Sequence, residues 1–120
     1  MTVARRAFAV ACVAIALPRV AAAHAVITSA QPEHGSTIRP GAVAITLSYN
    51  ARIDRARSQL TLMSPAGHAT ALRLREDSTV SVLRADATVD QPGQWRLRWQ
   101  VLAADGHITR GDILFRVAAS

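Results

Sequence analysis

Most of the chain beyond residue 24 alternates apolar and polar residues with a period of two. The pattern is clearest in five runs: Val43–Tyr49, Leu60–Met63, Leu72–Arg75, Trp95–Val101 and Asp112–Val117. A period of two sends successive side chains to opposite faces of an extended strand, so that one face is buried and the other is solvated. Two shorter runs, 25–29 and 79–83, are weaker strand candidates. The pattern therefore predicts about seven half-buried antiparallel strands.

Turn-forming residues separate these runs. They are P-E-H-G at 32–35, P-G at 40–41, S-P-A-G at 64–67 and Q-P-G at 91–93. Segment 52–58 fits either one helical turn or an irregular link. Short strands divided by such turns, with no convincing long helix, are typical of an all-β Greek-key β-sandwich or barrel in a single domain. Trp95 and Trp99 fall on one strand face, which we expect to be buried.

The N-terminal segment follows a different pattern. Arg5 and Arg6 precede an apolar run at 7–17, and small residues follow in the sequence A-A-A-H at 21–24. A basic start, a short apolar core and small residues are the signature of a cleaved signal peptide. The run falls short of the roughly 20 residues that a membrane-spanning helix needs. We expect a signal peptide at 1–23, cut after Ala23, and one exported domain at 24–120. The general secretion pathway fits better than the twin-arginine pathway.

Charge and cysteine content exclude several classes of function. The whole chain has a formal charge of +6, but three arginines lie within 1–23, which leaves eleven arginines against eight acidic residues in 24–120. The arginines are scattered along the sequence, whereas a nucleic-acid-binding protein usually clusters its basic residues, so we expect no nucleic-acid partner. The only cysteine, Cys12, also lies in the expected signal peptide. The processed domain would therefore contain no disulfide and no cysteine metal site.

Cleavage after Ala23 would make His24 the first residue of the processed protein. An N-terminal histidine offers an α-amine and an imidazole to the same metal ion. Asp105 and His107, in A-A-D-G-H-I-T-R-G, are two residues apart and would share a face of an extended chain. These donors make three nitrogens and one oxygen, a set that suits tetragonal Cu(II) better than tetrahedral zinc. We expect one Cu(II) ion per chain, held by His24, Asp105 and His107.

Other interpretations of the histidines stay open. Asp105 and His107 on their own also fit a simple Asp-Gly turn with an exposed histidine. His68, in L-M-S-P-A-G-H-A-T, follows a turn and could lie exposed. His34, in P-E-H-G-S, could fold back toward the copper ligands or stay apart from them.

The two ends of the domain carry a family resemblance. The opening residues, from position 24, read H-A-V-I-T-S-A-Q-P-E-H-G-S; the closing residues, from position 93, read G-Q-W-R-L-R-W-Q-V-L-A-A-D-G-H-I-T-R-G-D-I-L-F-R-V. Both resemble the CopC family of periplasmic copper-resistance proteins, and the middle of 24–118 is matched by strand pattern alone. The resemblance implies a cupredoxin-like or immunoglobulin-like fold that binds Cu(II) through His24, Asp105 and His107. It also implies a separate partner, an inner-membrane copper transporter of the CopD type. Some family members hold Cu(I) in a methionine-rich loop with a histidine, and the corresponding residues here are Met63 and His68.

These observations together predict a periplasmic copper-binding protein for copper resistance and homeostasis. We expect a monomer that sequesters or delivers Cu(II) and catalyses no reaction. One alternative is a copper monooxygenase, which resembles lytic polysaccharide monooxygenases in using an N-terminal histidine brace. Asp105 argues against it, because its carboxylate would occupy a position at copper that oxygen chemistry needs open. The other alternative is a metal-free immunoglobulin-like interaction module, which would follow if the signal were cut elsewhere.

Overall fold

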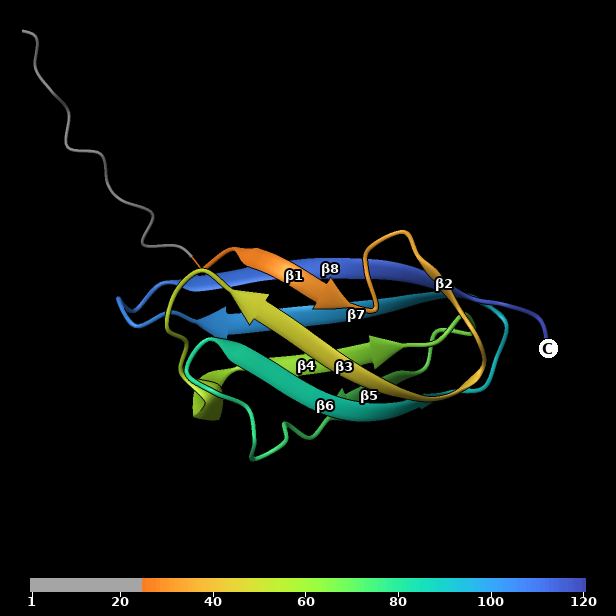
Figure 1. Cartoon of the computed structure of the whole chain (residues 1–120), viewed down its shortest axis with the longest axis horizontal. Coiled ribbons are helices and arrows are strands. Elements are labelled where there is room, and N and C mark those ends of the chain that lie inside the picture. Colours follow the sequence, from red (N-terminus) through yellow and green to blue (C-terminus); the bar gives the residue numbers. More distant parts are fainter. Residues whose placement is uncertain (1–24) are drawn as a thin grey trace, which may run out of the picture.

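The computed structural model describes residues 25–120, so the expected signal peptide and His24 lie outside the described residues. The described residues form two β-sheets packed face to face (Figure 1). Their strands are β1 (Ile27–Gln31), β2 (Thr37–Ile38), β3 (Gly41–Tyr49), β4 (Gln59–Met63), β5 (Ala69–Leu72), β6 (Val82–Val89), β7 (Gly93–Leu102) and β8 (Ile108–Val117). The predicted all-β sandwich is confirmed, with eight strands in the described residues where about seven were expected.

The chain passes repeatedly from one sheet to the other. The first sheet has the strand order β1-β3-β6, and the second has the order β2-β8-β7-β4-β5. Neighbouring strands are antiparallel, apart from the short parallel pair β2–β8. Such crossing connections are typical of Greek-key sandwiches. β7 and β8, by contrast, follow one another in the same sheet, pair over ten positions and form its longest hairpin.

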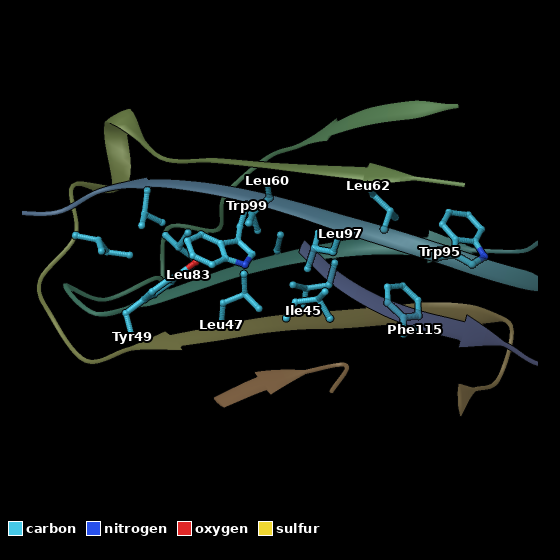
Figure 2. Close-up of a cluster of buried hydrophobic side chains, with 14 of the residues drawn as sticks. Ile45, Leu47, Tyr49, Leu60, Leu62, Leu83, Trp95, Leu97, Trp99 and Phe115 are labelled. Atoms are coloured by element: carbon cyan, nitrogen blue, oxygen red, sulfur yellow. The ribbon is translucent and has the colours of Figure 1, made fainter. Parts of the chain in front are cut away.

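The core lies between the sheets, where the inward-facing residues of both meet (Figure 2). Trp95 and Trp99 are 5% and 7% exposed, so their predicted burial is confirmed. Tyr49 on β3 meets Trp99 edge-on across the sandwich, with ring centroids 5.5 Å apart. This arrangement is among the favoured geometries for aromatic pairs. It ties the end of β3 to the second sheet.

Two strand predictions need correction. The run Leu72–Arg75 continues as a strand only to Leu72, because the chain then turns at 76–77 and leaves Leu74 in a single bridge to Ala85. The strand predicted at 79–83 lies instead at Val82–Val89. Thr79 forms a bridge to Val82 across a tight turn, which brings the chain into β6.

The segment between β3 and β4 forms one short 3-10 turn, Arg55–Arg57, which agrees with the helical turn considered for 52–58. The hydroxyl of Ser58 donates a hydrogen bond to the carbonyl of Asp54 across this turn, at 2.6 Å. Among residues 25–120 there is no helix with the length and hydropathy to cross a bilayer. The segment matters because the residues just before it brace the end of the β7–β8 hairpin.

Candidate metal centre

A tight turn at 103–107 joins β7 to β8. The amide of Ala103 donates to the carbonyl of His107 at 2.9 Å, and the amide of Gly106 donates to the carbonyl of Ala103 at 2.9 Å. Gly106 has a φ of +90°, a conformation that glycine adopts without the steric cost that a Cβ would bring. The D-G-H sequence therefore forms a closed and hydrogen-bonded turn.

The turn brings Asp105 and His107 into direct contact. Oδ2 of Asp105 lies 2.8 Å from Nδ1 of His107, and Oδ1 accepts a hydrogen bond from the backbone amide of His107 at 3.1 Å. The sequence analysis placed both side chains on one face of an extended chain, whereas the structure brings them together through a turn. The Asp105 side chain is 30% exposed and that of His107 is 60% exposed, so both remain accessible.

The contact sets the charge of Asp105 and the tautomer of His107. The backbone amide of His107 holds the pKa of Asp105 below its ordinary value, the ring contact adds to this effect, and desolvation opposes it. An ionised carboxylate can only accept hydrogen bonds, so Nδ1 of His107 must donate. In the neutral ring, the lone pair is then on Nε2. This is the arrangement in which a carboxylate orients a metal-binding imidazole.

Backbone contacts from the segment after β3 hold the turn against the sandwich. The amide of Ala104 donates to the carbonyl of Arg52 at 3.0 Å. The amide of Asp54 donates to the carbonyl of Leu102 at 2.8 Å, and Ile53 bridges Ala103 between them. The base of the turn is therefore fixed, while Asp105 and His107 project beyond it.

The start of the described chain lies at the same end of the sandwich (Figure 1). Ala25 is fully buried, the amide of Val26 donates to Oδ1 of Asn50 at 2.8 Å, and the amide of Asn50 donates to the carbonyl of Val26 at 3.0 Å. Asn50 is two residues from Arg52, a span of at most about 7 Å. This anchoring role of Asn50 was missed in the sequence analysis, since no local motif links residues 24 positions apart.

The described residues supply only part of the expected ligand set. Within 25–120, no group of three or more His, Cys, Asp or Glu side chains is placed to hold a metal ion. Asp105 and His107 are in contact there, and His24 lies outside the described residues. The participation of His24 accordingly stays a prediction.

His34 is held at a different place. Its Nδ1 accepts a hydrogen bond from the amide of Leu114 at 3.1 Å, and the neighbouring amide of Gly35 donates to the carbonyl of Leu114 at 2.7 Å. Leu114 is six residues beyond Ile108 on β8, which corresponds to about 20 Å along an extended strand. The structure therefore does not bring His34 to the D-G-H turn. Through its hydrogen bond with Leu114, His34 instead ties the loop before β2 to β8.

Met63 pairs with Ala69, the residue after His68, but Met63 and His68 line different hollows. Met63 lines a hollow with Pro65 and Arg96, whereas His68 lines a different hollow with Thr70 and Leu72. His68 is exposed, and its amide donates to the Ser64 hydroxyl in the β4–β5 turn at 3.1 Å. This placement favours the interpretation of His68 as an exposed turn residue.

Comparisons with known proteins agree with this architecture. A search of curated proteins gives no significant match. Among solved structures, CopC from Methylosinus trichosporium OB3b is 22% identical, with a TM-score of 0.70 over 79% of this chain and 94% of that chain. PcoC, a methionine-rich copper resistance protein from Escherichia coli, is 16% identical, with a TM-score of 0.58 over 78% of this chain and 98% of that chain. At these identities the likeness concerns the fold. The model of the CopC domain, however, matches residues 27–118, and the chain therefore belongs to the CopC family.

Proposed function

We propose that the processed protein, beginning at His24, binds one Cu(II) ion per chain in the periplasm and serves copper resistance and homeostasis. The observation that carries the proposal is the contact between Asp105 and His107 at 2.8 Å, at the end of the sandwich where the described chain begins. Membership of the CopC family supports copper as the metal. It also favours binding over catalysis, and thus over the monooxygenase alternative.

In this proposal, His24 and the D-G-H turn contribute complementary ligands. His107 offers Nε2, because its Nδ1 is engaged by Asp105. His24 offers its α-amine and its imidazole, and it directly precedes the buried Ala25. Asp105 adds a carboxylate oxygen once its carboxylate leaves Nδ1, since Nδ1 and Nε2 point in different directions from the ring. Three nitrogens and one oxygen in one plane are the arrangement that Cu(II) prefers.

The proposal also concerns the fate of the copper. A CopC-type site on a small monomer suits sequestration or transfer by ligand exchange, because both Asp105 and His107 are accessible from solvent. We include as the receiving partner a separate inner-membrane copper transporter of the CopD type. We propose this partner from membership of the CopC family and not from a particular contact surface.

An electron paramagnetic resonance spectrum of the processed protein with one equivalent of Cu(II) tests the proposed site. N-terminal sequencing first establishes that the exported chain begins at His24. We expect an axial spectrum with nitrogen hyperfine structure from three donors. A spectrum identical to that of Cu(II) in buffer would contradict the site, as would a spectrum lacking nitrogen coupling.

Replacing either residue of the D-G-H pair should weaken Cu(II) binding. We expect Asp105→Ala and His107→Ala each to raise the Kd by at least about 10–100-fold, the loss typical of removing a group that holds or orients a metal ligand. A competition titration against a chelator of known affinity measures the change. His68→Ala is the matched control, because it removes an exposed histidine from another turn. If His107→Ala bound as tightly as His68→Ala, the turn would not be the site.

A further inference from the structure

The outer face of the five-stranded sheet carries four arginines on its adjacent strands β7 and β8. They are Arg96, Arg98, Arg110 and Arg116, and we call them the basic face. The residues that alternate with them, such as Leu97 and Phe115, are buried in the core, so the arginines point away from it. Arginines that are scattered in the sequence are thus brought together by strand alternation and pairing.

The basic face accounts for the whole charge excess of the domain. Residues 25–120 hold eleven arginines and eight acids, an excess of three positive charges. The strands that form the outer face of this sheet contribute the four arginines and one acid, Asp112. The remaining seven arginines and seven acids balance one another. The excess positive charge of the domain is therefore concentrated on one sheet face, and the charges of the other residues sum to zero.

Asp112 organises the basic face without neutralising it. Its carboxylate accepts hydrogen bonds from Nη1 of Arg96 at 2.8 Å and from Nε of Arg98 at 3.1 Å. The hydrogen bond from Arg98 is the main cause that lowers the pKa of Asp112, with the charges of both arginines adding to it. One carboxylate is thus shared by two guanidinium groups. The triad keeps one net positive charge and holds both arginines in defined orientations.

Arg110 is held in a similar way. Its Nε donates to Oε1 of Gln100 on the paired strand at 2.7 Å. In Arg98 and Arg110, the hydrogen bonds found within residues 25–120 engage Nε, so the terminal amino groups of both guanidiniums are available to a ligand. Arginine pairs with a carboxylate through such parallel donors, and a fixed guanidinium loses less freedom on binding than a free one.

Arg98 and Arg110 line the same hollow on the sheet surface. Arg98 is opposite Asp112 and Arg110 is opposite Gln100, so the two arginines are diagonal neighbours, about 7–8 Å apart at their α-carbons. Gln59 and Thr61 of β4 line it as well, together with Gln100, Gly111 and Asp112, and the two oxygens of Asp112 are engaged by Arg96 and Arg98. Every side chain that lines the hollow is polar. A carboxylate placed here could contact both guanidinium groups at once.

We propose that the basic face docks an acidic segment of a partner protein, with an Asp or Glu carboxylate seated between Arg98 and Arg110. The oriented guanidiniums and the polar hollow favour a carboxylate over a lipid surface. Proteins that lie on membranes usually add apolar or aromatic side chains that enter the bilayer, and none lines this hollow. The basic face is separate from the D-G-H turn, so the inference does not depend on copper binding.

The test uses the copper-free processed chain and a fluorescently labelled deca-glutamate peptide as the probe. We expect binding that weakens as salt is added, and an Arg98→Gln/Arg110→Gln variant that binds about tenfold more weakly. The control is Arg57→Gln/Arg84→Gln, which removes the same charge from the 3-10 turn and from β6 of the other sheet. The control should lose less than about threefold, as expected for a screened long-range effect.

Further arms separate the alternatives. An Arg98→Lys/Arg110→Lys variant keeps the charge but removes the planar guanidinium groups that pair with a carboxylate, so it should also bind more weakly than the original chain. This variant provides the test if the Gln variant does not fold. Equal losses in the Gln variant and its control would overturn the proposal. So would binding to phosphatidylglycerol vesicles without binding to the peptide, which would identify a membrane surface as the partner.

Discussion

A processed protein with one extra residue before His24 should bind Cu(II) at least about 100-fold more weakly. The extra residue converts the α-amine of His24 into an amide, and this removes one nitrogen of the proposed chelate. A free α-amine has a pKa near 8 and gives up its proton readily to a metal, whereas an amide does not. Competition titrations of the processed and extended chains measure the difference. A chain extended by one residue after Ser120 is the matched control.

The structure explains why the chain should not adapt to this extension. Ala25 is fully buried, Val26 is bonded twice to Asn50, and Ile27 is in register with Tyr49 on β3. Moving the strand by one residue to reposition a new amine would expose Ala25 and turn every β1 side chain to the opposite face. If the extended chain bound copper as tightly as the processed chain, the amine would not be a ligand.

The strand pattern predicted the fold well where side chains are large. The runs around Trp95–Val101 and Val43–Tyr49 became long strands, because bulky alternate residues had only one way to be buried. β6 was misplaced because its inward residues include Ala85 and Ala87, whose small side chains give a weak apolar signal between Arg84 and Asp86. β2 was missed because two residues carry no period, and its pairing with β8 defines it as a strand.

For the candidate site, too, the sequence predicted local features and missed those that depend on the tertiary fold. Asp105 and His107 could be singled out because their contact is local, within one turn of the chain. The support from Asn50 and Arg52 could not, since it depends on which loops the sheets bring together. The basic face is intermediate. Alternation alone places Arg96 and Arg98 on one side of β7, but only the β7–β8 register adds Arg110 beside them.

A second large effect is expected from Gly111→Ala on β8. Gly111 is directly opposite Trp99 on β7, and a Cβ at this position would lie about 2.7 Å from Cε2 of the indole and closer still to Cζ2. The indole cannot yield easily, because it is buried and meets Tyr49 edge-on. Overpacking of this kind costs about 1–3 kcal/mol. Each kcal/mol corresponds to about 4–8 °C in the Tm of a domain of this size, which thermal unfolding measures.

The prediction is specific because Gly111→Ala should lower the stability, whereas the same substitution usually raises it. An alanine in a strand, where the backbone permits it, is otherwise more favourable than glycine, because glycine loses more conformational freedom on folding. In a Trp99→Leu background the clash is removed, so Gly111→Ala should cost little there or even raise the Tm. The same loss in both backgrounds would show that Trp99 is not the obstacle. The requirement for glycine at position 111 would then have a cause other than the side chain of Trp99 on the paired strand.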